Sequence, residues 1–466
     1  MGLAWRVAAE PNHTTVRTVP QKPSTEQRPA AAFLTLALES GHPERTPRRR
    51  QLHPTRRLFL GRGGSDSQPP GPGSDFLAIE DSRLSRRHAE LLCDADGSWA
   101  IRDLCSTNGT FHNGQRVTEA PLQSNDIIQC GRSVLLFRMA QSRVGAAQPP
   151  PLDVPPGFWT LNPSYEEALE RLSHVARTNL PVVLLGETGT GKEVTARGIH
   201  EVSARPGPFI ALNCGALSSG LAEAQLFGHV RGAFSGAVKD GVGFVRAAQY
   251  GTLFLDEVAE LPASTQVLLL RVLEAREVTP VGSVVPCPVD FRVLAATNRS
   301  LDQLVEAGEF RRDLYARLAG FVHEIPPLRE RLEDLGGLIG AWQRQQSGAS
   351  LSSLRAELAL ELFRHPWPLN TRGLFQSLAS ACVVARGEPL GLEHWDFGPS
   401  GAGASTRPSD ATELCPADQK LRGELVALLA EYQGNLAAVG RRLGKARQQV
   451  QRWVVRLGID VDRYRR

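Results

Sequence analysis

The chain has 466 residues, a formal net charge of only +4 and seven scattered cysteines. This length predicts roughly three domains, and no apolar run approaches the ~18 residues of a membrane span. The charge does not mark the whole chain as a nucleic-acid binder, so charge has to be examined locally. Single cysteines without metal-like spacing are typical of a reducing cytosol, and we expect a cytoplasmic protein with no membrane contact.

The first 140 residues fall into two parts. Residues 1–30 carry Pro, Thr and Arg without periodicity, which predicts disorder. Residues 31–140 contain short β-like runs separated by turns, and this spacing predicts a β-sandwich. The clearest runs are 33–38, 57–60, 99–101 and 133–137.

Three blocks inside the predicted sandwich are Gly61-Arg62, the segment 83–89 and the segment 103–114. Together they resemble the forkhead-associated (FHA) domain, which implies loops that bind a phosphothreonine-containing protein or kinase. Two arginines can fork onto a phosphate, a serine can add a neutral donor, and Thr and Asn can line the peptide edge. The expected phosphothreonine-binding residues are Arg62, Ser85, Arg86, Thr107 and Asn108. His88 is expected to brace the loops, and a basic solvated face is the alternative for the arginines.

A proline-rich linker, 141–156, precedes a segment with the spacing of a phosphate-binding loop. The loop follows the apolar run 182–185 and precedes a helical pattern, so its backbone amides and Lys192 can hold the phosphates of ATP. A glycine-rich turn is the alternative. The expected nucleotide-binding residues here are Gly186, Glu187, Thr188, Gly189, Thr190, Gly191, Lys192 and Glu193. Glu193 stands where a magnesium-binding Ser or Thr usually follows the lysine.

Two later strands are predicted to end beside this loop. The run 251–255 leads to Asp256 and Glu257, which we expect to hold Mg²⁺ through water and to polarise an attacking water, respectively. An acidic helix N-terminus is the alternative. The run 291–296 leads to Asn298, which would sense the γ-phosphate.

Segment 226–237 lies between these motifs, and with the blocks 212–214, 310–318, 325–331 and 367–372 it resembles the AAA+ domain of sigma-54-dependent bacterial activators. In that family the phosphate loop characteristically ends in Lys-Glu, which accounts for Glu193. The resemblance implies an α/β P-loop ATPase with a helical lid over residues 157–397, with ATP and Mg²⁺ as cofactors. The implied partner is the sigma-54 RNA polymerase holoenzyme.

The resemblance also implies roles for single residues. Asn213 would hold Glu257 back from water, and Arg372 would be a second sensor. Arg311 and Arg317 would act in trans as arginine fingers, which requires a homo-oligomer, usually a hexamer. The loop that engages sigma-54 would be Gly232, Ala233, Phe234, Ser235, Gly236 and Ala237, with Phe234 exposed; a hydrophobic plug for the subunit interface is the alternative. Ser235, Leu369 and Gly373 depart from the family pattern.

After a second linker, 398–412, the region 413–466 has helical patterns at 421–432, 436–443 and 446–457. It resembles a Fis-type helix-turn-helix, and its eleven Lys and Arg against six acids give +5, which suits double-stranded, enhancer-like DNA. Base contacts are expected from Arg447, Gln448 and Gln451, and phosphate contacts from Arg441, Arg452 and Arg456. A simple three-helix packing motif is the alternative.

The whole pattern predicts a multidomain fold: an FHA β-sandwich, an AAA+ ATPase with its lid, and an all-α helix-turn-helix. The expected function is ATP-driven remodelling of sigma-54 polymerase closed complexes, controlled by phosphothreonine recognition because no receiver-like segment precedes the ATPase. Two other functions fit parts of the pattern. One is a phosphopeptide adaptor whose ATPase does not drive transcription, and the other is a remodeller of a different protein.

Overall fold

The computed structural model describes residues 30–63, 71–141, 155, 157–217, 220–346, 351–397, 416–443, 454 and 464. The chain forms two compact units, Met1–Pro399 and Ser400–Arg466. The predicted disordered segment and both predicted linkers lie almost entirely outside the described residues. Within the described ranges, no helix is long and apolar enough to cross a membrane.

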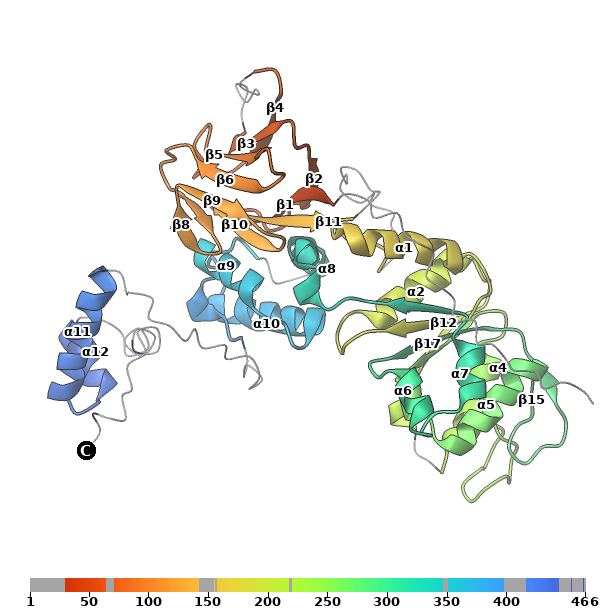
Figure 1. The fold of residues 1–466 in the computed structure, drawn as a ribbon. Helices are drawn as coiled ribbons and strands as arrows, with labels where there is room; N and C mark the ends of the chain where they lie inside the picture. The colour runs from red at the N-terminus through yellow and green to blue at the C-terminus, as the bar shows by residue number, and fades with distance from the viewer. Residues whose placement is uncertain are drawn as a thin grey trace, which may run out of the picture. The chain divides into compact units, whose positions relative to one another are not determined.

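The N-terminal part of the first unit is a sandwich of two β-sheets (Figure 1). One sheet has the order β2-β1-β11-β10-β7-β8 and the other β4-β3-β5-β6-β9. The four strands expected from the sequence fall within β1, β3, β6 and β11. The bounds are β1 Ala31–Glu39, β2 Arg48–Leu52, β3 Arg57–Arg62, β4 Ser74–Ile79, β5 Ala89–Cys93, β6 Trp99–Asp103, β7 Thr110–His112, β8 Gln115–Val117, β9 Glu119–Leu122, β10 Asp126–Cys130 and β11 Ser133–Ala140.

The sequence of β1 explains its central place in the molecule. Its side chains are buried at all eight positions after Ala31. Leu34 and Leu36 lie in the core between the two sheets, whereas Ala37 and Leu38 belong to a second apolar cluster outside the sandwich. A continuous apolar run is what a strand covered on both faces requires.

The next part of the unit is a five-stranded parallel sheet in the order β13-β14-β17-β12-β18. Because the strands are parallel, their carboxyl ends meet at one edge, where binding residues gather. Its strands are β12 Val182–Leu185, β13 Phe209–Asn213, β14 Thr252–Asp256, β17 Arg292–Thr297 and β18 Phe321–Glu324. A separate pair, β15 Glu277–Val278 and β16 Cys287–Pro288, is antiparallel. The helices are α1 Pro163–Ala176, α2 Lys192–Ser203, α3 Ala222–Phe227, α4 Phe244–Ala247, α5 Ala263–Ala275, α6 Leu301–Glu306 and α7 Arg312–Leu318.

Three further helices form the lid: α8 Leu335–Gln345, α9 Ala356–Arg364 and α10 Asn370–Ala385. Figure 1 shows α8 and α9 beside the sheet that contains β1, β10 and β11. Leu335, Ile339 and Leu358 share one buried apolar cluster with Ala37 and Leu136 of the sandwich. The outer face of the sandwich and the lid therefore form one continuous core.

The second unit contains α11 Pro416–Glu431 and α12 Leu436–Leu443. Leu425, Leu429 and Val439 are buried together with Val454. Helix α12 has the predicted bounds, whereas α11 begins five residues before the predicted start at 421. The third predicted helix lies almost entirely outside the described residues.

Candidate functional site

The predicted phosphate loop connects β12 to α2. Gly186, Gly189 and Gly191 have φ values of 159°, 80° and 103°, and the last two fall in the left-handed region that favours glycine. A Cβ at Gly189 would lie 2.2 Å from the carbonyl oxygen of Leu369, so the loop approaches the lid at backbone distance. Glycine at 189 is thus required by both conformation and space.

Lys192 is the first residue of α2, and its ammonium group reaches back over the loop. Its Nζ donates to the carbonyl oxygens of Gly186, at 2.8 Å, and Glu187, at 3.1 Å. Burial lowers the pKa of Lys192, while Asp256 and Glu257 act in the opposite direction. The ammonium therefore stands close to both predicted catalytic carboxylates.

One cavity of about 610 Å³ gathers most of the predicted nucleotide site. The residues in its lining come from the phosphate loop, the carboxyl ends of three strands and the lid. Those expected from the sequence are Thr188, Gly189, Gly191, Lys192, Glu193, Asn213, Asp256, Glu257, Asn298 and Arg372. The lining also includes Val194, Thr371, Phe375, Gln376 and Ala379, which the sequence reasoning missed.

The missed lid residues follow a helical pattern on α10. Positions 372, 375, 376 and 379 recur at intervals of three and four residues, so they share one face of the helix. That spacing was the available signal once Arg372 had been placed in the site. The departure at Leu369 introduces no backbone strain, because its φ of −102° is ordinary for leucine.

The side chain of Glu187 points away from the cavity and ties the loop to the lid. Arg329 donates to both of its carboxylate oxygens, at 2.6 and 2.9 Å, and lowers the pKa of Glu187. Asn370 donates to the same carboxylate at 3.1 Å and to the carbonyl oxygen of Thr188 at 3.0 Å. Glu187 is thus outside the cavity lining and stabilises the conformation of the phosphate loop through these hydrogen bonds.

Asn213 and Glu257 both approach Gly215, where a Cβ would lie 2.8 Å from Glu257 Oε2 and 3.3 Å from Asn213 Oδ1. Asn213 Oδ1 accepts a hydrogen bond from the amide of Ala216 at 3.2 Å. Glu257 directly follows β14 and has a φ of 52°, a left-handed backbone conformation that is uncommon for residues other than glycine. Both side chains thus lie beside Gly215, and the role of Asn213 in holding Glu257 stays a prediction.

The two predicted arginine fingers lie outside the cavity lining. Arg311 is exposed and forms an ion pair with Asp313 at 2.6 Å, and this pairing lowers the pKa of Asp313. Arg317 donates to the carbonyl oxygen of Leu273 at 3.3 Å. Neither lines the nucleotide cavity of this chain.

The loop that the resemblance assigns to sigma-54 is a compact turn. Gly232 donates from its amide to the carbonyl of Ala237 at 2.9 Å, and Gly232 and Gly236 have φ values of 82° and 103°. Phe234 is half-buried and not exposed as expected, because its ring packs against His229 at 5.0 Å between centroids. Phe234 lines an apolar groove of about 500 Å³, whereas Ser235 is exposed.

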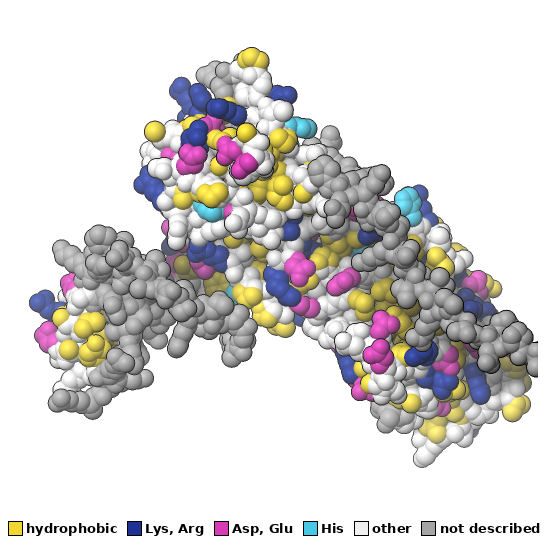
Figure 2. Space-filling view, viewed as in Figure 1, with side chains coloured by type: hydrophobic (Ala, Val, Ile, Leu, Met, Phe, Trp, Pro, Cys, Tyr) yellow, Lys and Arg dark blue, Asp and Glu magenta, His cyan; other side chains and the backbone are white. Residues whose placement is uncertain are grey.

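The three blocks of the sandwich meet at one end of the domain. Thr107 donates from its amide to Ser85 Oγ at 3.2 Å, and Asn108 donates to the carbonyl of Arg83 at 2.6 Å. Arg62 and Arg86 are exposed, and Arg62 donates its amide to the carbonyl of Ser85 at 3.0 Å. Figure 2 shows Lys and Arg side chains gathered over the β3–β5 end of the sandwich.

His88 is buried beneath the loops at this end of the sandwich and hydrogen-bonds to two of them. It is fully buried, accepts a hydrogen bond at Nδ1 from the amide of Ser85 at 3.2 Å, and contacts the carbonyl of Gly109 through Nε2 at 3.2 Å. Burial lowers the pKa of His88, which favours the neutral ring. The histidine therefore has the geometry of the brace that was expected.

The predicted DNA-binding residues Arg447, Gln448, Gln451, Arg452 and Arg456 lie outside the described residues.

The fold and the cavity define an AAA+ domain, and the sandwich is an FHA domain. The model of the "Sigma-54 interaction domain" matches residues 159–323, and the "FHA domain" model matches residues 59–131. The chain therefore joins an FHA domain to a sigma-54 interaction domain.

Curated relatives include the anaerobic nitric oxide reductase transcription regulator NorR of Citrobacter koseri, 40% identical over 64% of this chain and 62% of that protein. The C4-dicarboxylate transport transcriptional regulatory protein DctD of Rhizobium meliloti is 46% identical over 46% of this chain and 47% of that protein. Among solved structures, NtrX from Brucella abortus in complex with ATP is 27% identical over 65% of this chain and 69% of that chain, with a TM-score of 0.48. The chain thus spans less than two thirds of the length of the first of these relatives.

Proposed function

We propose that this chain is an ATP-dependent transcriptional activator that remodels sigma-54 RNA polymerase closed complexes. The observation that carries the proposal is the convergence of Lys192, Asp256, Glu257, Asn298 and Arg372 on one cavity inside a sigma-54 interaction domain. Relatives named as transcription regulators support the same function. The complete protein's activity and partners are part of the proposal.

The cavity's own residues suit hydrolysis of a nucleotide triphosphate. Lys192 and the loop amides would hold the phosphates, Asn298 and Arg372 would contact the γ-phosphate from the sheet edge and the lid, and Glu257 would orient the attacking water. Asn213, on the neighbouring strand, would hold Glu257 back from that water until the nucleotide state changes. Together these groups would position the reactants and stabilise developing charge.

Magnesium fits the chemistry of this cavity. Among the described residues no cluster of three or more His, Cys, Asp or Glu could hold a metal by itself. Mg²⁺ usually takes one or two carboxylates and completes its shell with water and substrate phosphates, which matches a single donor at Asp256. The ion would supply charge neutralisation between the outer phosphates.

Arg311 and Arg317 favour an oligomer. Both lie outside the cavity of their own subunit, so each would have to complete a neighbour's site. An arginine at the transferring phosphoryl group is worth roughly 10³-fold or more in rate. We therefore propose a ring, most simply a hexamer, as the active form.

Phe234 would couple hydrolysis to sigma-54. Its half-buried ring in the apolar groove would be released as the turn between Gly232 and Gly236 changes conformation. The C-terminal region, with Arg447, Gln448, Gln451, Arg452 and Arg456, would bind enhancer-like DNA.

The FHA domain would bind a phosphothreonine protein and pass the signal to the ring. Arg62, Arg86 and Ser85 would contact the phosphate, while Thr107 and Asn108 would hold the peptide edge. A phosphothreonine peptide library should contain ligands whose binding Arg62→Ala removes; an unaffected variant would refute this part.

The decisive test is sigma-54-dependent open-complex formation with purified components and ATP. The intact chain should open the promoter, Glu257→Ala should lose both hydrolysis and opening, and Phe234→Ala should keep hydrolysis and lose opening. If the intact chain hydrolyses ATP but opens no promoter, with or without phosphopeptide, this proposal fails and remodelling of a different protein becomes the leading alternative.

A further inference from the structure

A short segment between the ATPase sheet and the lid touches both the phosphate loop and the FHA domain. This strap, residues 328–334, contains two 3₁₀ turns, Leu328–Glu330 and Leu332–Asp334. It leads directly into α8 at Leu335. Hydrogen bonds join its residues to the phosphate loop, to the FHA domain and, through Asp334, to the segment before α1.

Two arginines of the strap face the phosphate loop. Arg329 forms the bidentate contact with Glu187, at 2.6 and 2.9 Å. Arg331 donates from Nη2 to the carbonyl oxygen of Thr190 at 2.8 Å, and its buried guanidinium lies 5.6 Å from the ring centroid of Tyr165. The outer side of the phosphate loop is therefore held by the strap at both ends of the segment 187–190.

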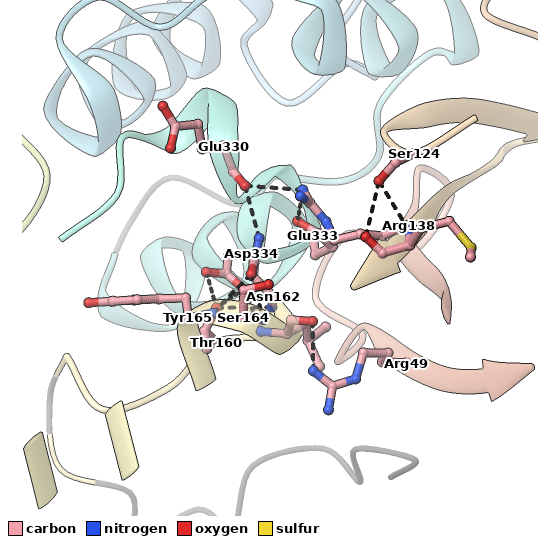
Figure 3. Close-up of polar contacts among 12 residues, drawn as sticks. Arg49, Ser124, Arg138, Thr160, Asn162, Ser164, Tyr165, Glu330, Glu333 and Asp334 are labelled. Atoms are coloured by element: carbon pink, nitrogen blue, oxygen red, sulfur yellow. Dashed lines mark hydrogen bonds and ion pairs between the residues drawn. The ribbon is translucent and has the colours of Figure 1, made fainter. Parts of the chain in front are cut away.

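Glu330 and Glu333 of the strap contact the FHA domain. Arg138, on β11, donates to the carbonyl oxygen of Glu330 at 3.0 Å and to Glu333 Oε2 at 3.1 Å, with a second contact from Nε to Oε1 (Figure 3). The Glu333 side chain is only 1% exposed. A buried carboxylate needs a charged partner, and Arg138 is its ion-pair partner among the described residues.

Further contacts join the sandwich to the ATPase on both sides of this ion pair. A Cβ at Gly336 would lie 1.9 Å from the carbonyl oxygen of Ala37, so the first turn of α8 meets β1 at backbone distance. On the other side, the fully buried Arg49 of β2 donates to the carbonyl of Leu161 at 3.0 Å and to Glu166 of α1 at 2.5 Å. The sandwich therefore contacts the ATPase at a segment that precedes the phosphate loop in the chain and at another that follows it.

We propose that Arg138 is a positioning residue for the phosphate loop, acting from the FHA domain through Glu333 and the strap arginines Arg329 and Arg331. The inference rests on the proposed function for the nature of the nucleotide, and it adds the route by which the FHA domain reaches the ATPase site. Losing Arg138 would leave the Glu333 carboxylate buried and unpaired. The strap would then shift, and the loop would lose part of its outer support.

Native-state hydrogen exchange of the full chain tests the proposal, because it reports local opening without needing a bound nucleotide. In Arg138→Met the amides of residues 186–191 should exchange about tenfold faster than in the original chain. Arg138→Lys, which keeps the charge but loses the fork, should lie between them. The matched control is Arg102→Met, which removes another arginine of the FHA domain, half-buried and paired with the buried Glu90 at 3.1 Å and with Glu119 at 3.0 Å; it should leave the loop unchanged.

The double variant Arg138→Met/Glu333→Met should protect the loop better than Arg138→Met alone, because it removes the unpaired buried charge. If Arg138→Met is too unstable to study, Glu333→Gln should give a smaller increase in exchange at the same amides. A fluorescent ATP analogue should bind Arg138→Met five- to tenfold more weakly.

Equal loop exchange in Arg138→Met and the original chain would overturn the proposal. So would an equal increase in Arg102→Met, since the effect would then not pass through the strap. Failure to open a sigma-54 promoter would count against the proposed function alone, because the exchange difference does not depend on transcription.

Discussion

Replacing Asn370 should loosen the junction between the phosphate loop and the lid. Asn370 is fully buried, and its Oδ1 accepts a hydrogen bond from the amide of Leu328 at 2.8 Å. Its Nδ2 donates to Glu187 and Thr188. It also has a φ of 50°, a left-handed conformation that asparagine tolerates better than most residues.

The cost of Asn370→Ala has two parts. Losing the hydrogen bonds and leaving the buried amide of Leu328 without a partner should cost about 2–4 kcal/mol. Holding alanine at a φ of 50° adds about 1 kcal/mol. Asn370→Gly removes the same hydrogen bonds without the left-handed penalty, so it should be about 1 kcal/mol less destabilised locally than Asn370→Ala.

The measurement is the local opening free energy of α10 and the phosphate loop from native-state hydrogen exchange. A local measure is needed because a multidomain chain has no single free energy of unfolding. Opening free energies within ~0.5 kcal/mol of the original chain would refute the argument from hydrogen bonds. Equal values for Asn370→Ala and Asn370→Gly would refute the argument from backbone conformation.

Three further predictions test other parts of the molecule. Gly189→Ala should weaken ATP-analogue binding at least tenfold, because a Cβ at 189 meets the Leu369 carbonyl oxygen at 2.2 Å; unchanged affinity would contradict this. Gly61→Ala should lower phosphothreonine-peptide affinity about tenfold in a titration, because its Cβ would lie 2.0 Å from the Arg86 carbonyl oxygen and push two binding loops apart. Unchanged affinity would count against the site. Burial lowers the pKa of His323 from 6.5 to about 4, with Arg171 contributing, so the folded state binds fewer protons than the unfolded state between these values. The contribution of neutral His323 to the free energy of unfolding, at most about 3 kcal/mol, should be complete above pH 6.5 and lost as the pH falls through 4. The opening free energy of β18 from hydrogen exchange should fall with pH over this range, and His323→Asn should remove that dependence.

Much of the candidate site could be predicted because its residues follow directly from chain topology. Parallel strands bring their carboxyl ends to one edge, so Asn213, Asp256 and Asn298 had to lie near the phosphate loop once the strands were identified. Four strands of the sandwich, β1, β3, β6 and β11, were likewise visible as apolar runs between turns. The segment 83–89 follows β4, which the sequence reasoning did not identify.

The contacts that depend on tertiary packing could not be predicted in the same way. Nothing local in the sequence pairs Arg138 with Glu333, which lie 195 residues apart. Phe234 was expected to be exposed because the resemblance assigns its loop to sigma-54, but its ring packs against His229. One signal for the FHA–lid contact was available in β1, whose apolar residues on both sides of Thr35 point to both faces of the strand.

The shared core between the sandwich and the lid bears on how deletion experiments should be interpreted. Cutting the chain in the linker before residue 157 would expose Leu335, Ile339 and Leu358 to water and leave Glu333 without Arg138. An ATPase prepared without its sandwich would then lose activity through a damaged lid, even if the sandwich normally restrained it. Point substitutions at Arg62 or Arg86 leave this core intact. They are therefore the sounder way to ask whether the FHA domain would activate or inhibit the AAA+ domain.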